Sequence, residues 1–245
     1  MRLLRVARVG NSSAVTATRA DIEAAWRNLT AAVARRDGPA ALAAVGPGQR
    51  LGLLQTAGPA ALVALGHDVP DAGTAAAGLA EALTGRGWDG DNVLTELITA
   101  TVTASPTGRR LLVVDLDMLG DVLADGSGGW LDLGSGYAWP QDLLDDGALE
   151  DILGPEQEPD RWLGIGFGGS HDAWQDMADY VASLADGPAA ADLSQAIDGR
   201  GAFRRFQKAL DKHSDLRVHW RVHSSELRTG RARAWLADAG YDATP

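Results

Sequence analysis

WLDLGSGYAWP, residues 130–140, is the segment that decides the fold class. Runs of strand-forming residues lie at 130–133 and 137–139, on either side of Gly134-Ser135-Gly136. Glycines in a short connection supply the backbone conformations that a tight turn between antiparallel strands requires. The segment therefore predicts a β-hairpin, and it argues against an all-helical chain.

Two further strand-like runs flank the hairpin. LLVVDL (111–116) precedes it, with a short helix expected over 117–124, and RWLGI (161–165) follows it. Beyond residue 170 the apolar residues recur at spacings of three and four, which is typical of helices. We expect these helices over residues 170–184, 193–197, 202–210 and 214–239. Strands followed by helices indicate an α+β fold, with a small antiparallel sheet packed against C-terminal helices.

The first half of the chain has a different pattern. Residues 21–104 are rich in alanine, leucine and glycine, and their apolar spacing is helical. SPTGRR (105–110) carries a proline and a glycine and separates two hydrophobic runs. We therefore predict an alanine-rich helical region at 1–104, a linker at 105–110 and an α+β domain at 111–245.

The composition restricts the environment of the chain. Its 245 residues are 45% hydrophobic and include no cysteine, so a core can form, while disulfides and thiolate sites are excluded. Arg5 and Arg8 interrupt the apolar residues at the start, so no signal peptide is expected there. No run approaches the roughly eighteen apolar residues of a membrane span. We expect a cytoplasmic protein with no membrane partner.

Charge is distributed unevenly along the sequence. The formal net charge is -11, but residues 111–199 hold nineteen acidic side chains and one basic side chain, Arg161. Residues 200–235 hold ten basic side chains and three acidic ones. A basic stretch beside an acidic one predicts either charge pairing within the fold or a surface for an acidic partner.

The basic stretch supplies a candidate binding surface. On a helix over 202–210, we expect Phe203, Phe206 and Leu210 to share a buried face, and the cations to point elsewhere. The candidate surface comprises Arg200, Arg204, Arg205, Lys208, Lys212, Arg217 and Arg221, which Arg228, Arg231 and Arg233 can extend. Such a surface suits nucleic-acid phosphates, although no recognition module accompanies it. The alternative is that these arginines neutralise the acidic stretch in the same fold or in a partner subunit.

A glycine-rich loop resembles a dinucleotide-binding fingerprint. Gly164, Gly166 and Gly169 follow the pattern G-x-G-x-x-G, between an expected strand and an expected helix. A cofactor site also requires an acidic residue at the end of a second parallel strand, and Asp186 ends a helical pattern instead. We therefore expect no cofactor, and we interpret the loop as a turn into a helix capped by Ser170.

Two groups of side chains are candidate metal ligands. Asp115, Asp117 and Asp121 follow the run at 111–116, and carboxylates at a strand end are suited to Mg²⁺. The alternative for this group is structural, because Asp117 is placed to cap the following helix. In the second group, His219, His223 and Glu226 lie on one face of a helix, with a boundary role as the alternative.

Several segments resemble an uncharacterised bacterial family, number 0158 of the UPF series. They are GRGAFRRFQKAL (199–210), WQDMADYV (174–181), RARAWLADAG (231–240) and the hairpin at 130–140. RGWDGD (86–91) looks like a segment of actinobacterial members, and abundant alanine, glycine and arginine with few lysines fit such a genome. The resemblance implies no reaction, because the family is defined by sequence alone.

The chain also departs from the pattern of that family. Relatives usually carry an acidic residue where Tyr137 stands, and prolines where Gly166 and Phe167 stand. If that acidic residue were a catalyst in the family, this chain would lack it.

No complete catalytic set is visible in the sequence. We therefore expect a non-catalytic cytosolic interaction or regulatory protein, with a protein partner or a second copy of the chain as its partner. A nucleic-acid-associated protein that uses the basic helices is one alternative. A metal-dependent enzyme built on Asp115 and Asp117 is the other.

Overall fold

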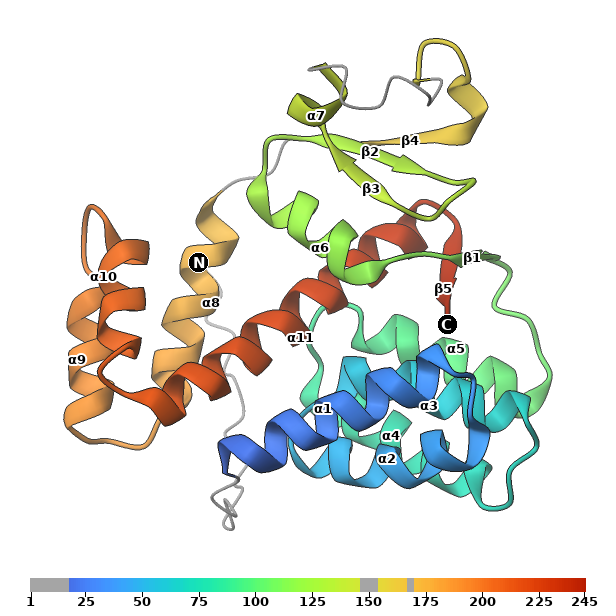
Figure 1. Ribbon diagram of the computed structural model, residues 1–245, viewed down its shortest axis with the longest axis horizontal. Helices are drawn as coiled ribbons and strands as arrows, with labels where there is room; N and C mark the ends of the chain where they lie inside the picture. The colour runs from blue at the N-terminus through green and yellow to red at the C-terminus, as the bar shows by residue number, and fades with distance from the viewer. Residues whose placement is uncertain (1–17, 146–153, 167–169) are drawn as a thin grey trace, which may run out of the picture.

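The computed structural model describes residues 18–145, 154–166 and 170–245, and it confirms the α+β fold with a helical first half. Figure 1 shows a helical bundle, a small sheet above it, a separate group of helices at one end, and one long helix that runs through all three parts. That long helix is α11 (Ser214–Asp238).

The first half folds into a bundle whose core consists mainly of alanine and leucine side chains. Small side chains let the helices approach closely, so the bundle packs without large aromatic residues. A capping box at Thr18 and Asp21 begins the first helix. The helices are α1 (Arg19–Ala34), α2 (Gly38–Arg50), α3 (Leu54–Gly66), α4 (Ala72–Arg86) and α5 (Asp91–Thr103).

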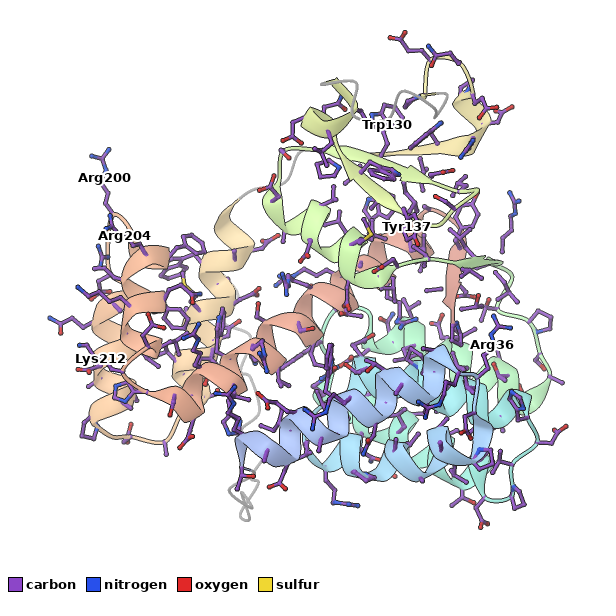
Figure 2. All side chains as sticks on the ribbon, viewed as in Figure 1. Arg36, Trp130, Tyr137, Arg200, Arg204 and Lys212 are labelled. Carbon is purple, nitrogen blue, oxygen red and sulfur yellow. The ribbon has the colours of Figure 1, made fainter. Side chains whose placement is uncertain are left out.

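The predicted hairpin is present in an antiparallel sheet of order β3-β2-β4. Trp130, labelled in Figure 2, lies on the central strand. It pairs with Trp139 of one neighbouring strand and with Gly164 of the other. Asp132 fixes the turn, because its carboxylate accepts hydrogen bonds from the Gly134 backbone (2.8 Å) and from the Arg161 guanidinium (2.7 Å). The Arg161 guanidinium holds the pKa of Asp132 well below its usual range. The strands are β2 (Gly129–Asp132), β3 (Ala138–Pro140) and β4 (Trp162–Ile165).

The run at 111–116 forms a second sheet. β1 (Arg110–Val113) pairs in parallel with β5 (Tyr241–Thr244), a strand that the sequence pattern did not predict. The strand ends at Val113, before the end of the predicted run at residue 116, because α6 (Leu116–Asp125) begins at Leu116. Asp115, rather than the expected Asp117, caps α6 by accepting a hydrogen bond from the Met118 backbone at 2.9 Å.

The other C-terminal helices form a core of their own. Tyr180, Leu193 and Phe206 are buried together, and Trp220 of α11 packs against them. The prediction of a buried face is wrong for Phe203, which is 44% exposed in the first turn of α10, outside this core. The helices around this core are α8 (Ser170–Ser183), α9 (Pro188–Ala196) and α10 (Ala202–Leu210). The sheet instead packs on α6, which lies between the sheet and α11 (Figure 1).

Glu226 of α11 attaches the second half of the chain to the bundle. Its carboxylate accepts hydrogen bonds from the backbone nitrogens of Gln55 (2.6 Å) and Thr56 (3.0 Å), and from the Thr56 hydroxyl (2.8 Å). These are the first amides of α3, whose own N-cap residue, Leu53, provides no side-chain acceptor. A carboxylate 170 residues away in sequence therefore caps α3.

The same carboxylate belongs to a buried ionic network. Arg86 donates to Glu226 at 2.9 Å and to Asp91 at 2.7 Å, and both carboxylate side chains are 1% exposed. Gln55 donates to Asp91 (2.8 Å) and accepts from the Nε atom of Arg233 (2.9 Å). Burial lowers the pKa of Arg233 to about 10. The network joins α3, α4 and α5 to α11.

The backbone of α11 meets the turn before α5 at two glycines beside this network. A Cβ atom on Gly230 would overlap the carbonyl oxygen of Asp89, and one on Gly90 would overlap the carbonyl oxygen of Gly230. Trp88 stacks under the Arg86 guanidinium and packs edge-on against His223. α11 therefore packs against the RGWDGD segment of the bundle.

We predict that Glu226→Gln lowers the free energy of unfolding by about 3 kcal/mol, because it leaves Arg86 partly unpaired in a buried position. The matched control is Glu96→Gln, since Glu96 also pairs with an arginine, Arg109, but its side chain is 55% exposed. We expect the control to cost less than about 1 kcal/mol. Urea denaturation measures both, and equal losses would contradict the network's role.

We predict that Gly230→Ala destabilises the chain by roughly 2 kcal/mol, because its methyl group displaces α11 from the turn at Asp89. Gly78→Ala is the control, since a methyl group added at this position in α4 meets no atom within 4 Å. Here alanine should stabilise by up to about 1 kcal/mol through helix propensity. Thermal denaturation should therefore shift in opposite directions for the two variants.

Candidate functional site

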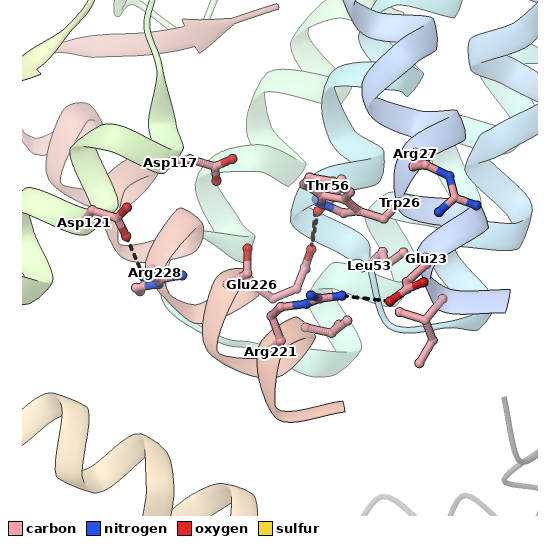
Figure 3. Close-up of a pocket in the computed structure, with 13 residues that line it drawn as sticks. Glu23, Trp26, Arg27, Leu53, Thr56, Asp117, Asp121, Arg221, Glu226 and Arg228 are labelled. Carbon is pink, nitrogen blue, oxygen red and sulfur yellow. Dashed lines mark hydrogen bonds and ion pairs between the residues drawn. The ribbon is translucent and has the colours of Figure 1, made fainter. Parts of the chain in front are cut away.

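A groove lies between α1, α6 and α11, beside the contact of Glu226 with α3 (Figure 3). Its cavity volume is about 500 Å³, within the range of small-molecule sites. The groove exists because the network above fixes α11 against α3, while α1 and α6 flank it without closing over it. We call it the α1/α11 groove and define it by Ile22, Glu23, Trp26, Arg27, Leu53, Thr56, Asp117, Asp121, Arg221, Val222, Ser225, Glu226 and Arg228.

The apolar surface of the groove comes from three elements. Ile22 of α1, Leu53 before α3 and Val222 of α11 contribute aliphatic side chains. Trp26 of α1 lies over them, and 45% of its surface is exposed. An exposed tryptophan beside an apolar cavity offers a stacking surface to a ligand.

Most charged groups of the groove already have partners. Glu226 is saturated by its contacts to α3 and Arg86. Asp121 pairs with Arg228 at 2.5 Å, and Glu23 pairs with Arg221 at 3.5 Å. These carboxylates are therefore engaged in structural contacts within the fold.

Asp117 differs from the other carboxylates of the groove. The hydrogen bond that it accepts from the Thr229 hydroxyl is long, at 3.3 Å. Burial raises the pKa of Asp117, the neighbouring Asp115 and Asp121 raise it further, and the Thr229 hydrogen bond and Arg228 oppose this. Asp117 is solvent-exposed and weakly hydrogen-bonded, so its carboxyl can accept a hydrogen bond from a ligand.

The groove continues at both ends. Past Arg221 and Arg228 it meets a hollow of about 560 Å³ between the start of α1 and α10–α11. Past Trp26 and Asp117 it meets a hollow of about 290 Å³ that reaches Pro245. A ligand longer than the central cavity can therefore extend along α11.

The structure separates the carboxylates that the sequence grouped as metal ligands. Asp115 caps α6, Asp121 pairs with Arg228, and Asp117 faces the groove. In the part of the chain that the structure describes, no group of three acidic or histidine side chains is arranged to hold a metal ion. The metal-dependent alternative for Asp115 and Asp117 thus gains no support from the geometry.

The second candidate metal group is also divided. Glu226 serves the cap of α3, and His219 is exposed on α11. His223 packs among the rings of Trp88, Tyr180 and Trp220, and burial lowers its pKa. This histidine belongs to an aromatic boundary between the bundle and the C-terminal helices.

The predicted basic surface is only partly available. Arg205 is turned back, since its guanidinium donates to the carbonyl oxygens of Ala196, Asp198 and Arg200 at the end of α9. Pairing with carboxylates occupies three more cations: Lys212 with Asp192, Arg217 with Asp211 and Arg221 with Glu23. Arg200, Arg204 and Lys208 are exposed, and Figure 2 shows Arg200 and Arg204 pointing away from the body.

The proposed extension of that surface is wrong for Arg233. This side chain is 2% exposed and lies in the buried network. Arg228 and Arg231 pair with acids of the 111–199 stretch, Asp121 and Asp176. Because helical spacing alone does not show which face a neighbouring half covers, the sequence could not separate these arginines.

The glycine-rich loop falls largely outside the described residues. Gly164 lies in β4, and Gly169 belongs to the segment 167–169, which the structure does not describe. The helix that follows begins at Ser170, and the predicted cap by its side chain lies outside the described residues. Asp186 follows the end of α8, as its helical spacing predicted.

Comparisons of the chain with protein-family models, with curated proteins and with solved structures found no match. The resemblance to family 0158 of the UPF series therefore stays a prediction. Among the described helices, none combines the length and the apolar character needed to cross a bilayer.

Sequence reasoning missed the groove. Trp26 follows the same helical spacing as the apolar residues Ile22 and Leu29, so nothing in the sequence marked it as part of a site. The residues that complete the groove come from α1, α3, α6 and α11, and no local pattern joins segments so far apart. Of the residues that line the groove, Asp117 had been selected from the sequence, but as a candidate metal ligand.

We predict that Asp117→Asn stabilises the protein slightly at pH 7, by well under about 1 kcal/mol, because solvent screens this exposed side chain. Folding raises the pKa of Asp117 above its ordinary value of 3.8, so the folded state disfavours the ionised form. The penalty is absent below pH 3.8 and appears as the pH rises through the folded pKa.

The gain from Asp117→Asn should therefore vanish in acid, which urea denaturation at pH 7 and near pH 3 measures. Asp121→Asn is the matched control, since Asp121 is ion-paired with Arg228 and its side chain is 65% exposed. A stabilisation of the control, or a gain in Asp117→Asn that does not depend on pH, would contradict the assignment.

Proposed function

We propose that the chain is a non-catalytic cytoplasmic binding protein that holds an organic ligand in the α1/α11 groove. One observation carries the proposal: a cavity of about 500 Å³ places a half-exposed tryptophan opposite a carboxyl that is only weakly hydrogen-bonded, at 3.3 Å. A sequence without cysteine suits a reducing compartment such as the cytoplasm.

The chemistry of the groove indicates the class of ligand. Trp26 favours an aromatic or other flat apolar group, and the aliphatic floor supports it. Asp117 favours an ammonium or another hydrogen-bond donor, whose charge the neighbouring Asp115 and Asp121 also attract. The ligand class is therefore an aromatic amine or a molecule that contains one.

The partners of the other carboxylates argue for binding rather than catalysis. General acid–base chemistry requires a group that can exchange a proton with the substrate, usually beside a second such group. Glu226 and Asp121 are engaged in hydrogen bonds and ion pairs, so Asp117 has no available carboxylate partner among the described residues that line the groove. A regulatory protein that responds to its ligand fits this arrangement.

Tryptamine and indole-3-propionate provide a test, because they share a ring and carry opposite charges. We predict that tryptamine binds wild-type protein with a Kd on the order of 1 mM, typical of a fragment, and that indole-3-propionate binds at least about tenfold more weakly. Ligand-observed NMR measures both affinities. Trp26→Ala should abolish tryptamine binding, and Asp117→Asn should remove the preference for the amine.

Trp174→Ala is the matched control, since Trp174 is also partly exposed, at 37%, but lies on α8 away from the groove. Its affinity for tryptamine should equal that of the wild type. Equal binding by Trp26→Ala and wild type, or a preference for the acid over the amine, would disprove the proposed site.

A further inference from the structure

The smaller hollow beyond Trp26 and Asp117 contains a buried arginine. Its volume is about 290 Å³, and Arg233 of α11 lines it. Trp26, Asp117 and Ser225 line both this hollow and the α1/α11 groove, so the two cavities share a boundary. Every side chain that lines the hollow belongs to the described part of the chain. We call this cavity the Arg233 hollow.

The guanidinium of Arg233 is buried without an ion-pair partner. Arg233 is 2% exposed, and its one hydrogen bond among the described residues joins its Nε atom to Gln55. The Nη2 atom is buried and has no partner within the same residues. By contrast, Arg86 and Arg109 each pair with two carboxylates. A buried donor that lacks an acceptor is costly, and more so when it is charged, so Arg233 favours an acceptor from a ligand.

The guanidinium stays charged although it is buried. Burial lowers the pKa of Arg233 only to about 10, and nearby carboxylates oppose the fall. Other donors already engage these carboxylates: Arg86 binds Asp91 and Glu226, and Arg109 binds Asp242. The three arginines and the three carboxylates balance in formal charge, so a lone anion beside Arg233 would leave a negative excess. The hollow therefore favours a ligand group that carries both a negative and a positive charge.

The carboxylates of the hollow itself favour the same kind of ligand. Asp115 and Asp117 line it together with Arg233. They repel an anion and attract a cation, while Arg233 does the reverse. Asp115 accepts a hydrogen bond from the Met118 backbone, whereas Asp117 holds only the long hydrogen bond from Thr229. Asp117 is therefore the group that is available to an ammonium.

Asp117 and Arg233 lie close to each other along α11. Ser225, Thr229 and Arg233 line the hollow at positions i, i+4 and i+8 of the helix, and thus on one side of it. The Thr229 hydroxyl lies 3.3 Å from the Asp117 carboxylate, and one turn separates the Cβ atoms of Thr229 and Arg233 by about 6 Å. The two charged groups therefore line one wall of the hollow, roughly one helical turn apart.

An α-amino acid suits this spacing. Its nitrogen and its carboxylate carbon are about 2.5 Å apart. With charge-assisted hydrogen bonds of about 2.8 Å at both ends, the charged end of the molecule spans roughly 8 Å between protein groups. Its side chain is then free to enter the groove, where Trp26 offers a stacking surface.

We propose that the Arg233 hollow binds the charged end of an aromatic α-amino acid. The carboxylate accepts hydrogen bonds from the guanidinium of Arg233, the ammonium donates to Asp117, and the ring stacks on Trp26. The proposal rests on the function proposed above, and it narrows the ligand from an aromatic amine to an aromatic amino acid. Such a ligand has no net charge, so the balance around Arg233 is preserved.

L-Tryptophan and tryptophanamide test the proposal on the wild-type protein, because only the first carries a carboxylate. Isothermal titration calorimetry near pH 6 keeps both α-amino groups protonated. We expect a Kd on the order of 0.1 mM for L-tryptophan, at least about tenfold tighter than for tryptophanamide or tryptamine. The Nε–H resonance of Arg233 should shift with L-tryptophan and stay in place with tryptophanamide, which checks the contact without any substitution.

Arg233→Met removes the guanidinium and keeps an unbranched side chain. It should weaken the binding of L-tryptophan about tenfold, to the level of tryptophanamide, while tryptamine binds as it does to the wild type. Arg217→Met is the matched control, since it removes the same charge from α11 at an exposed position that lines neither the groove nor the Arg233 hollow. It should keep the preference for L-tryptophan. Circular dichroism establishes that both variants are folded, and the wild-type comparison decides the question if Arg233→Met is not.

Three results would overturn the proposal while leaving the binding of amines in the groove intact. They are equal affinities of the wild type for L-tryptophan and tryptophanamide, an Arg233→Met variant that retains the preference, and a control that loses it. Equal binding of N-acetyltryptophan and L-tryptophan would also overturn it, because the hollow would then suit the carboxyl end of a peptide. If neither L-tryptophan nor tryptamine binds, this proposal and the proposed function both fail.

Discussion

The carboxylate of Glu226 is 1% exposed, and four donors from two helices of the bundle hold it there. An ionised group in that position is tolerable only while Arg86 and the first amides of α3 stay in place, because desolvation of an unpaired charge costs several kcal/mol. The position of α11 is thus determined jointly by this carboxylate and by the glycine contact at Gly230. The sheet and the C-terminal helices take their places from α11, since α6, β5, α8 and α10 all pack on it.

The groove is a consequence of that anchoring. Fixing α11 against α3 and α5 leaves a neighbouring side of α11 facing α1 and α6, and a cavity of about 500 Å³ remains between these helices. The buried network keeps the groove open, and a bound ligand is not needed for this. A site formed in this way is largely preformed, which favours affinity because little ordering accompanies binding.

The uneven charge along the sequence has two separate structural roles. Part of the basic stretch neutralises acids within the fold, as in the pairs Arg231–Asp176 and Arg228–Asp121. Another part, on α10, has no carboxylate partner among the residues that the structure describes, and it faces away from the body (Figure 2). Both alternatives raised by the sequence therefore apply, each to different residues. The division depends on which side of α11 the bundle covers.

The sequence by itself determined the fold class, the hairpin at 130–140 and the main helices, because turn glycines and apolar periodicity are local properties. It also marked Asp115, Asp117 and Asp121, although their roles proved to be a cap, a groove carboxyl and an ion-pair partner. Only the tertiary structure decided the pairing of β5, the burial of Arg233 and the site around Trp26. Each of these depends on contacts between segments more than a hundred residues apart, and such contacts leave no periodic trace in either segment.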